Sequence, residues 1–325
     1  MSNNSANHSH SSEKPKRTRR VFSDEFKRDA VNLVVKEGYT KADAARAVNV
    51  GYKTFSDWHA KFAPEPEPSQ RAQRTETIKA AVRQVHTSSK GIYGSYKIAE
   101  VLKENEKMES ACRNTVATAM REMGLKSKVS KRFKPTTTVT DPSRQPAPNV
   151  LNQDFVADAP NQKWVADITY LPTRTGWVYL AVVLDLFSRK VVGWSLSDSL
   201  ATPLVSSAMR KAIESRRPER GHLLHHSDRG CQYTSESFQQ TLRTLGITCS
   251  MSRAGCCYDN AVMERFFWSL KHEWTSHEQF TNLEEARMSV FEYIEIFYNT
   301  ERIHQTLNYQ TPEEFEKDYA ARLAA

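Results

Sequence analysis

The sequence predicts a multidomain protein in which all-α domains precede an α/β domain with a mixed sheet flanked by helices. From residue 21 to about residue 124, apolar residues recur at helical spacing. From residue 164 onward, three strand-like apolar runs follow one another, and helical and strand-like segments then alternate. A chain of 325 residues is long enough for about two or three domains with separate cores.

Charge divides the chain into a basic front and a mildly acidic back. Residues 1–135 hold 27 Lys and Arg against 15 Asp and Glu, a balance of +12, whereas residues 136–325 hold 19 against 23, a balance of −4. A basic segment suits a polyanionic partner such as nucleic acid. A solvated basic surface is nevertheless the commoner meaning of a charge run, so charge alone leaves both interpretations open.

The composition favours a cytoplasmic, nucleoid-associated protein without a membrane partner. The amino terminus lacks the apolar segment of a signal peptide, and the longest apolar run, residues 178–184, is too short to cross a bilayer. The five cysteines are an odd number in a chain without a secretion signal, which favours reduced thiols over a disulfide framework.

The first helical domain is expected at residues 21–63, after a disordered basic arm at residues 1–20 that ends in KPKRTRR. Ser23 and Thr40 stand where helix N-caps are expected, with Asp43 placed to complete a weak capping box. A third helix with inward aromatic residues follows and makes a helix-turn-helix, although three-helix units also serve as structural or protein-binding modules. The residues of the arm and of this helix expected to contact DNA are Arg17, Arg19, Arg20, Lys53, Thr54, Ser56 and Lys61.

A stiff Pro-rich linker at residues 64–74 separates this domain from a second helical module at residues 75–134. The last helix of the module is expected to begin at a Ser110 cap and to end before Gly124. The basic stretch KSKVSKRFK closes the module, and a second Pro-rich linker follows at residues 135–160. The residues of this stretch expected to contact DNA are Lys128, Lys131 and Arg132.

The α/β domain is expected at residues 161–275, with a helical extension at residues 276–325. WVADITY, VYLAVVLDLF and KVVGWSL are typical of three strands at hairpin spacing, which predicts an antiparallel meander. The remaining elements are expected as a helix at about 203–215, a strand at 222–226, a helix at 237–245, a strand at 247–251 and a helix over CYDNAVMERFFWSLKHEW.

Three acids on this frame suggest a metal site. Asp167 lies within the first strand, where an acid is unusual, Asp228 follows the fourth strand, and Glu264 lies on the helix with 35 residues between it and Asp228. Carboxylate oxygens suit Mg²⁺, and two such ions about 4 Å apart can bind both the attacking and the leaving oxygen of a phosphoryl displacement. We therefore expect Asp167, Asp228 and Glu264 to be catalytic metal ligands.

Two of these acids also have an ordinary structural explanation, and a fourth acid is a rival. Asp228 can cap a turn, Glu264 can be a solvated helix acid, and Asp185 in VVLDLFSR is a rival ligand on the second strand. Histidines and cysteines are frequent around HHSDRGC, but no CxxC pair occurs, so a structural zinc is not expected. His225 and His226 are instead expected to pack or to form hydrogen bonds beside the site.

The motifs around these acids resemble a known family. WVADITYLPTRTGWVYLAVVLDLFSRKVVGW, HSDRGCQYTS and YDNAVMERFFWSLKHE are similar to the integrase core of bacterial insertion-sequence transposases of the insertion-sequence-three family. FYNTERIHQTLNYQTPEEF is similar to the carboxyl-terminal signature of that family, and GIYGSYKIAEVL resembles the helical module before its core. Residues 21–63 resemble the helix-turn-helix that the family usually encodes in a separate upstream frame, so the resemblance covers about nine tenths of a fused chain.

The resemblance implies a ribonuclease-H-like fold with an Asp-Asp-Glu triad at Asp167, Asp228 and Glu264, and a DNA transposase that uses Mg²⁺ or Mn²⁺. Such an enzyme binds terminal inverted repeats, nicks the ends by hydrolysis and joins the 3′-hydroxyl ends to target DNA without a covalent protein intermediate. Asp185 has no catalytic counterpart there. Lys271, seven residues after Glu264, matches a basic position that contacts DNA near the reacting phosphate, and Asp259 and Asn260 are expected to cap the helix.

Two alternatives remain open from the sequence. Fused members usually carry a leucine-heptad segment between the two helical modules, but residues 64–77 are Pro-rich and polar here. Because synapsis of two DNA ends requires at least a dimer, the protomers are expected to pair through other surfaces. The same fold can also serve as a catalytically silent DNA-binding protein, a repressor or a target-binding subunit, and the intact triad argues against that reading.

Overall fold

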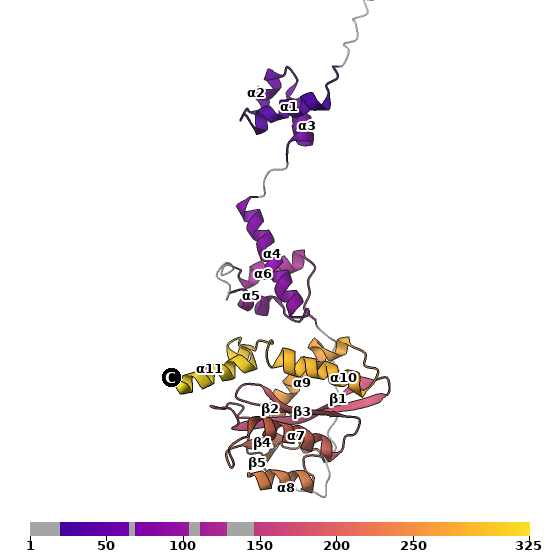
Figure 1. Ribbon diagram of the computed structural model, residues 1–325, viewed down its shortest axis with the longest axis vertical. Coiled ribbons are helices and arrows are strands. Elements are labelled where there is room, and N and C mark those ends of the chain that lie inside the picture. The colour runs from indigo at the N-terminus through magenta and orange to yellow at the C-terminus, as the bar shows by residue number, and fades with distance from the viewer. Residues whose placement is uncertain (1–19, 65–68, 104–110, 129–145) are drawn as a thin grey trace, which may run out of the picture. The chain divides into compact units, whose positions relative to one another are not determined.

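The computed structural model describes residues 20–64, 69–103, 111–128 and 146–325 (Figure 1). The chain divides into two compact units, Met1–Gln73 and Arg74–Ala325. In the ranges that are described, no helix is both long enough and apolar enough to cross a membrane.

The first unit is the predicted helix-turn-helix. It contains α1 (Asp24–Val35), α2 (Lys41–Ala47) and α3 (Tyr52–Phe62). The two predicted N-caps are confirmed, because Ser23 Oγ accepts from Phe26 N and Thr40 Oγ1 accepts from Asp43 N, both at 3.2 Å. Asp43 Oδ2 accepts a hydrogen bond from the Thr40 hydroxyl at 2.5 Å. A capping box would instead have this side chain accept from the Thr40 backbone amide, so the box is incomplete. The buried core of the unit is Ala30, Val31, Ala44, Ala45, Phe55 and Trp58.

The second helical module contains α4 (Gln70–Ser88), α5 (Ser95–Lys103) and α6 (Arg113–Glu122). Two predicted boundaries are wrong. α4 begins inside the predicted linker, because the stretch from Gln70 onward has no proline and is rich in good helix formers. The N-cap of α6 is Cys112 and not Ser110, which lies outside the described residues, because burial of Ala111 fixes the point where the chain enters the helix.

The α/β domain has a five-stranded mixed sheet of order β3-β2-β1-β4-β5, which confirms the predicted fold class. β2 pairs antiparallel with both β1 and β3, whereas β4 pairs parallel with both β1 and β5. The fourth strand was predicted to begin at residue 222 but begins at Leu224, because a turn occupies residues 220–222. The strands are β1 (Lys163–Thr173), β2 (Gly176–Asp185), β3 (Val191–Ser197), β4 (Leu224–Ser227) and β5 (Thr248–Met251).

Helices cover both faces of this sheet (Figure 1). α7 (Thr202–Arg216) and α8 (Glu236–Leu245) pack on one face, against a cluster that includes Trp164 and Ala166. α7 crosses β3 so closely that a Cβ on Gly193 would lie 2.4 Å from the Ala208 carbonyl oxygen, so only glycine fits there.

The other face of the sheet packs against the carboxyl-terminal helices. A cluster that includes Val165 and Leu171 of β1 continues into the buried side chains of these helices. The odd-numbered residues of β1 therefore face this layer, as the alternation of side chains along a strand requires. The elements of this layer are α9 (Ala261–Glu273), α10 (Leu283–Phe291) and a π-helical segment η4 (Glu292–Tyr298). The last helix, α11 (Pro312–Ala324), contacts Phe187 after β2 through the rings of Phe315 and Tyr319.

Candidate active site

The sheet brings Asp167 and Asp228 to neighbouring strands. β1 and β4 run parallel, with Lys163 opposite Leu224 and Val165 opposite His226. Continued by two residues, the same register sets Asp228, which follows β4 directly, opposite Asp167. The strand pairing thus accounts for two acids that are 61 positions apart in the sequence.

Helix α9 adds Glu264 in its first turn. The buried side chains of Met263 and Phe266 hold the helix against the sheet. Asn260 Nδ2 donates to the carbonyl oxygen of Ala166 at 3.3 Å, one residue before Asp167. Glu264 itself stays exposed on the helix surface, so it remains open to a ligand.

The three carboxyl groups interact electrostatically. Burial raises the pKa of Asp167 well above its usual value, and the charges of Asp228 and Glu264 raise it further. A hydrogen bond of 2.8 Å from Ile168 N and the charge of Lys271 act in the opposite direction. Desolvation raises the pKa of Glu264 as well. A cation placed among these groups would relieve this excess of negative charge.

The loop after β4 holds Asp228 through a close backbone approach. Gly230 N donates to Asp228 Oδ1 at 3.0 Å. A Cβ on Gly230 would lie 3.0 Å from that oxygen and 3.0 Å from Gln232 Oε1, so a larger residue would crowd the carboxylate. The glycine in HSDRG therefore lets the backbone orient the acid.

Lys271 lies on α9 near the three acids. Its Nζ is 4.7 Å from the ring centroid of Tyr170, at cation–π distance. Burial lowers the pKa of Lys271, and the negative charge of Asp167 partly opposes that effect. The predicted basic position is therefore close enough to the acids to interact with Asp167.

Tyr233 was missed by the sequence analysis. Its ring is buried, and its hydroxyl has no hydrogen-bond partner within the described part of the chain. Burial raises its pKa well above the usual value, and the charges of Asp167 and Asp228 add to that effect. The only signal was a tyrosine five residues after Asp228, and a loop has no periodicity that would show where its side chain points.

Asp185 is a structural residue and not a rival ligand. Its side chain is fully buried and accepts hydrogen bonds from Asn161 N at 2.7 Å, Phe187 N at 2.9 Å and Trp164 Nε1 at 3.2 Å. Burial raises its pKa to about 6, and the hydrogen bonds and the nearby Arg216 oppose that rise. Its oxygens are thus engaged by the protein itself.

The two histidines before Asp228 point to opposite faces of β4. His226 hydrogen-bonds to Ser250 Oγ at 2.8 Å and to Ser252 Oγ at 3.1 Å. His225 packs against the rings of Tyr233 and Phe238, which also contact each other. The packing and hydrogen-bonding roles predicted for the two residues are confirmed.

The predicted capping role of Asp259 and Asn260 is wrong. Asn260 occupies the N-cap position of α9 without a capping hydrogen bond: its Nδ2 donates to the Ala166 carbonyl, and its Oδ1 has no hydrogen-bond partner within the described residues. Asp259, in the short turn η2 (Cys257–Asn260), is fully buried and holds its surroundings together. It accepts from the backbone and guanidinium of Arg253 and from the side-chain amides of Asn149 and Gln153, at 2.8 to 3.0 Å.

The donor chemistry of the triad suits a hard divalent cation, since three carboxylates are the ligands that Mg²⁺ and Mn²⁺ prefer. In the arrangement described, no group of three or more His, Cys, Asp and Glu side chains from the described residues is placed to hold a metal ion. The fit therefore rests on the identity of the donors and on the repulsion that Asp228 and Glu264 exert on Asp167.

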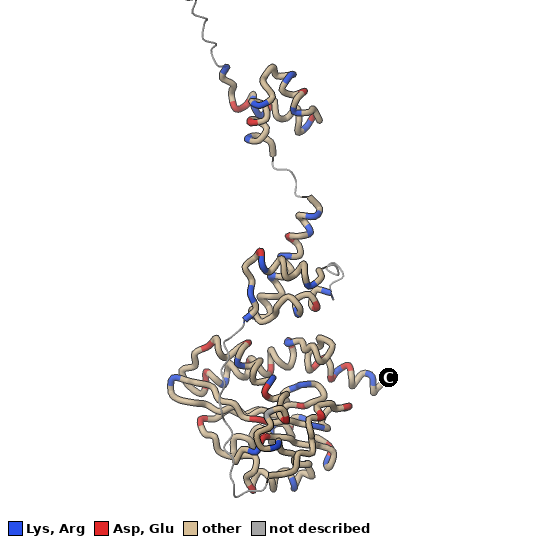
Figure 2. The backbone as a smooth tube through the Cα atoms, turned by 180° about the vertical axis from the view of Figure 1, so that it is seen from behind, with Lys and Arg blue, Asp and Glu red and all other residues tan. Residues whose placement is uncertain are grey.

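The predicted DNA contacts lie on several elements. On α3, Lys53, Thr54 and Lys61 are exposed and Ser56 is half-buried, while Phe55 and Trp58 face the core. Arg20 and Lys128 are exposed at the edges of described ranges, and Lys and Arg recur along the helical domains (Figure 2). The other predicted contacts, Arg17, Arg19, Lys131 and Arg132, lie outside the described residues.

Comparison with protein families finds matches along most of the chain. Residues 157–257 match a family described as an integrase core domain, and residues 245–312 match a second family with that description. Residues 73–133 match a family described as a helix-turn-helix-like domain, and residues 16–90 match one described as a transposase.

Individual proteins show the same similarity. The transposase for insertion sequence element IS904 of Lactococcus lactis subsp. lactis (strain IL1403) is 41% identical over 250 residues, which are 77% of this chain and 97% of that protein. Transposase InsF for insertion sequence IS3A of Escherichia coli (strain K12) is 40% identical over 261 residues, 80% of this chain and 89% of that protein. The HTLV-2 integrase catalytic core domain in complex with magnesium aligns with 50% of this chain and 99% of its own at 18% identity, with a TM-score of 0.39.

Proposed function

The chain belongs to the family of insertion-sequence transposases with helix-turn-helix domains and an integrase core, and we propose that it is a polynucleotidyl transferase that works through Asp167, Asp228 and Glu264. The proposal is supported by the parallel register of β1 and β4, whose last pair, Val165 and His226, lies two residues before Asp167 and Asp228, and by the influence of Asp228 and Glu264 on the pKa of Asp167. No observation on the described residues favours the silent DNA-binding alternative.

In the proposed reaction, water first attacks the phosphorus at the element end. The P–O3′ bond breaks, leaving a 3′-hydroxyl on the element and a 5′-phosphate on the flanking DNA. The freed 3′-oxygen then attacks a target phosphorus and forms the new P–O bond, while the 3′-oxygen of the target leaves and takes up a proton. No bond to the protein forms in either step.

The three carboxylates would hold Mg²⁺ or Mn²⁺, two ions per site, which supplies charge stabilisation for the attacking and leaving oxygens. Asp167 is the central ligand, because both other acids act on it. Lys271 is placed to meet a phosphate of the bound end, since its charge interacts with Asp167 from the adjacent helix. Gly230 keeps the Asp228 carboxylate in place for this task.

The helical parts would hold the DNA. We assign end recognition to the exposed Lys53 and Thr54 of α3, and phosphate contacts to the basic arm and to the basic stretch after α6. The substrate is double-stranded DNA, both the terminal inverted repeats and the target. A homo-oligomer, at least a dimer, would bring two ends together in the cytoplasm, at the nucleoid.

The test is an end-cleavage and strand-transfer assay on DNA that carries the inverted repeats flanking the gene, with Mg²⁺ or Mn²⁺. Asp228→Asn is expected to abolish nicking and joining while DNA affinity stays unchanged. Asp198→Asn, an exposed acid just after β3, is the matched control and should keep full activity. Cleavage by Asp228→Asn at the wild-type rate would refute the assignment of the site.

A further inference from the structure

The turn between α4 and α5 projects two apolar side chains. This docking turn, Ser89–Gly94, contains two consecutive left-handed residues, Lys90 at φ 53° and Gly91 at φ 76°. Ser89 Oγ accepts from Tyr93 N at 3.3 Å and donates to the His86 carbonyl at 3.0 Å, which closes the turn. The turn is therefore well defined, and its last four residues begin the GIYGSYK motif, to which the proposed function assigns no role.

Tyr93 of the docking turn connects to a segment more than 200 residues away. Its hydroxyl accepts from Ile303 N and donates to the Glu301 carbonyl, both at 3.0 Å. Residues 301–303 belong to no helix or strand, so these two backbone groups have no partner in a ladder. The buried phenol, 5% exposed, satisfies both with a single oxygen.

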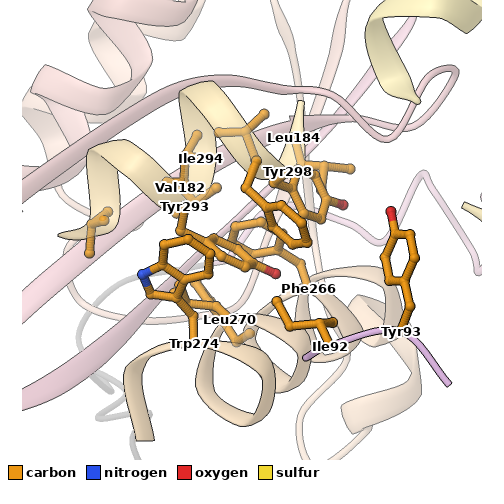
Figure 3. Packing of buried hydrophobic residues seen from close by; sticks show 14 of the residues in the cluster. Ile92, Tyr93, Val182, Leu184, Phe266, Leu270, Trp274, Tyr293, Ile294 and Tyr298 are labelled. Carbon is orange, nitrogen blue, oxygen red and sulfur yellow. The ribbon is translucent and has the colours of Figure 1, made fainter. Parts of the chain in front are cut away.

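The contact between the docking turn and residues 301–303, called the junction below, continues into apolar packing. Ile92 and Tyr93 belong to the same buried cluster as Phe266 and Leu270 of α9 (Figure 3). Phe266 and Leu270 lie two and six residues after Glu264. The junction therefore reaches the helix that carries the third acid.

Lys90 closes the edge of the junction. Its Nζ lies 4.1 Å from the centroid of the Trp274 ring and forms an ion pair with Glu292. Trp274 is the residue directly after α9, and Glu292 opens the π-helical segment η4. The docking turn thus contacts three separate parts of the core: α9, η4 and residues 301–303.

We propose that the docking turn is an intramolecular interaction surface that couples the second helical module to α9, so that DNA held by this module and the Glu264 carboxylate move as one body. The occupant of the surface is the module of the same chain. The coupling rests on the proposed function, because it assumes that the module holds an element end while the triad cuts it.

The experiment uses the full chain and the substitution Tyr93→Phe, which removes the one oxygen that bridges Glu301 and Ile303. Tyr96→Phe is the matched control, since Tyr96 lies on α5 of the same module and is 57% exposed. Hydrogen exchange of the Ile303 amide reports docking directly. Single-turnover cleavage of saturating end DNA and the Kd for that DNA report the coupling separately.

For Tyr93→Phe we expect exchange at Ile303 to accelerate at least tenfold and cleavage to slow about tenfold, with the Kd within twofold of wild type. Charge reversals of the Lys90–Glu292 ion pair test the same docking turn. Lys90→Glu and Glu292→Lys should each slow cleavage, and the double variant should recover much of the rate, which a general loss of stability would not produce.

Each contrary outcome would overturn one part of the proposal. Unchanged exchange at Ile303 in Tyr93→Phe would show that the contact does not form in solution. Faster exchange with unchanged cleavage would leave a structural contact and remove the coupling. Protection that falls on dilution would make the occupant a second copy of the chain. A wild-type protein that cuts no end DNA would instead remove the proposed function, and the exchange rates would still decide the docking contact.

Discussion

Replacing Lys97 by methionine is expected to stabilise the protein. Lys97 lies on α5, and its Nζ is buried without a hydrogen-bond partner within the described residues. Burial lowers its pKa from the ordinary 10.5 to about 7, and the charges of Arg302 and Arg265 contribute, while Glu273 acts in the opposite direction. The side chain also lies over the Tyr93 ring, with Nζ 4.8 Å from the ring centroid. Methionine keeps the length of the chain and removes the charge.

The magnitude follows from the shift in pKa. A fall from 10.5 to about 7, at about 1.36 kcal/mol per pKa unit, corresponds to a cost of at most about 5 kcal/mol for holding the ammonium. Loss of the cation–π contact with the Tyr93 ring costs about 1 to 2 kcal/mol. We therefore expect Lys97→Met to raise the free energy of unfolding by about 3 kcal/mol at pH 6. Because the folded pKa of this base is lowered, the cost is fully present below about pH 7 and disappears as the pH rises toward 10.5.

Urea unfolding of the full chain at pH 6 and pH 9, followed by tryptophan fluorescence, measures this gain. Five of the six tryptophans lie in the unit Arg74–Ala325, so the signal reports mainly on that unit. Lys103→Met is the control, because Lys103 is an exposed residue of the same helix that pairs with Glu100. It should change stability by less than about 0.5 kcal/mol. Equal or lower stability of Lys97→Met at pH 6, or a gain that grows with pH, would refute the reasoning.

Three further results are expected. Asp259→Asn should lower the free energy of unfolding by about 2 kcal/mol at pH 7, because Arg253 and the other donors hold the pKa of this buried acid well below its usual range. The difference in urea unfolding should shrink progressively as the pH falls from 3.8, the ordinary pKa of Asp, toward the lower pKa of the folded state, and a constant difference would contradict this origin. Tyr233→Phe should raise the thermal midpoint slightly, since it removes a buried hydroxyl that has no hydrogen-bond partner in the described part of the chain, and a fall would mean that the hydroxyl is bonded in solution. Excess Mg²⁺ should raise the thermal midpoint of the wild type by about 2 to 4 °C but not that of Asp228→Asn, and an equal rise in both would place the ion elsewhere.

The sequence was sufficient for features that depend on local pattern. An acid inside the alternating strand WVADITY, and another directly after HHS, are enough to mark Asp167 and Asp228 as candidate ligands. Asp185 shows the limit of that reasoning, since it has the same surroundings in the sequence and differs only in its distant donors, such as Asn161 N. Tyr93 shows it more strongly, because nothing in GIYGSYK indicates that its hydroxyl will meet backbone groups more than 200 residues away.

Asn260 stands at the N-cap position of α9 but contacts β1 instead of capping its own helix. Asparagine is among the best N-caps, yet at the start of α9 its side chain donates to the Ala166 carbonyl beside Asp167 instead of accepting from its own helix. The contact therefore sets the distance between the strand that carries Asp167 and the helix that carries Glu264. Asn282, by contrast, is a true cap, because its Oδ1 accepts from Glu285 N at 3.0 Å at the start of α10.

The substitution of aspartate separates these two roles. Aspartate caps helices about as well as asparagine but cannot donate to a carbonyl. Asn282→Asp should therefore leave stability and cleavage unchanged, whereas Asn260→Asp should slow cleavage about tenfold or more, because it repels the Ala166 carbonyl and misplaces Glu264. The Mg²⁺ concentration that gives half-maximal cleavage should also change in Asn260→Asp, a readout that simple loss of helix stability would not affect. Wild-type cleavage and Mg²⁺ dependence in Asn260→Asp would mean that the amide of Asn260 does not position the triad.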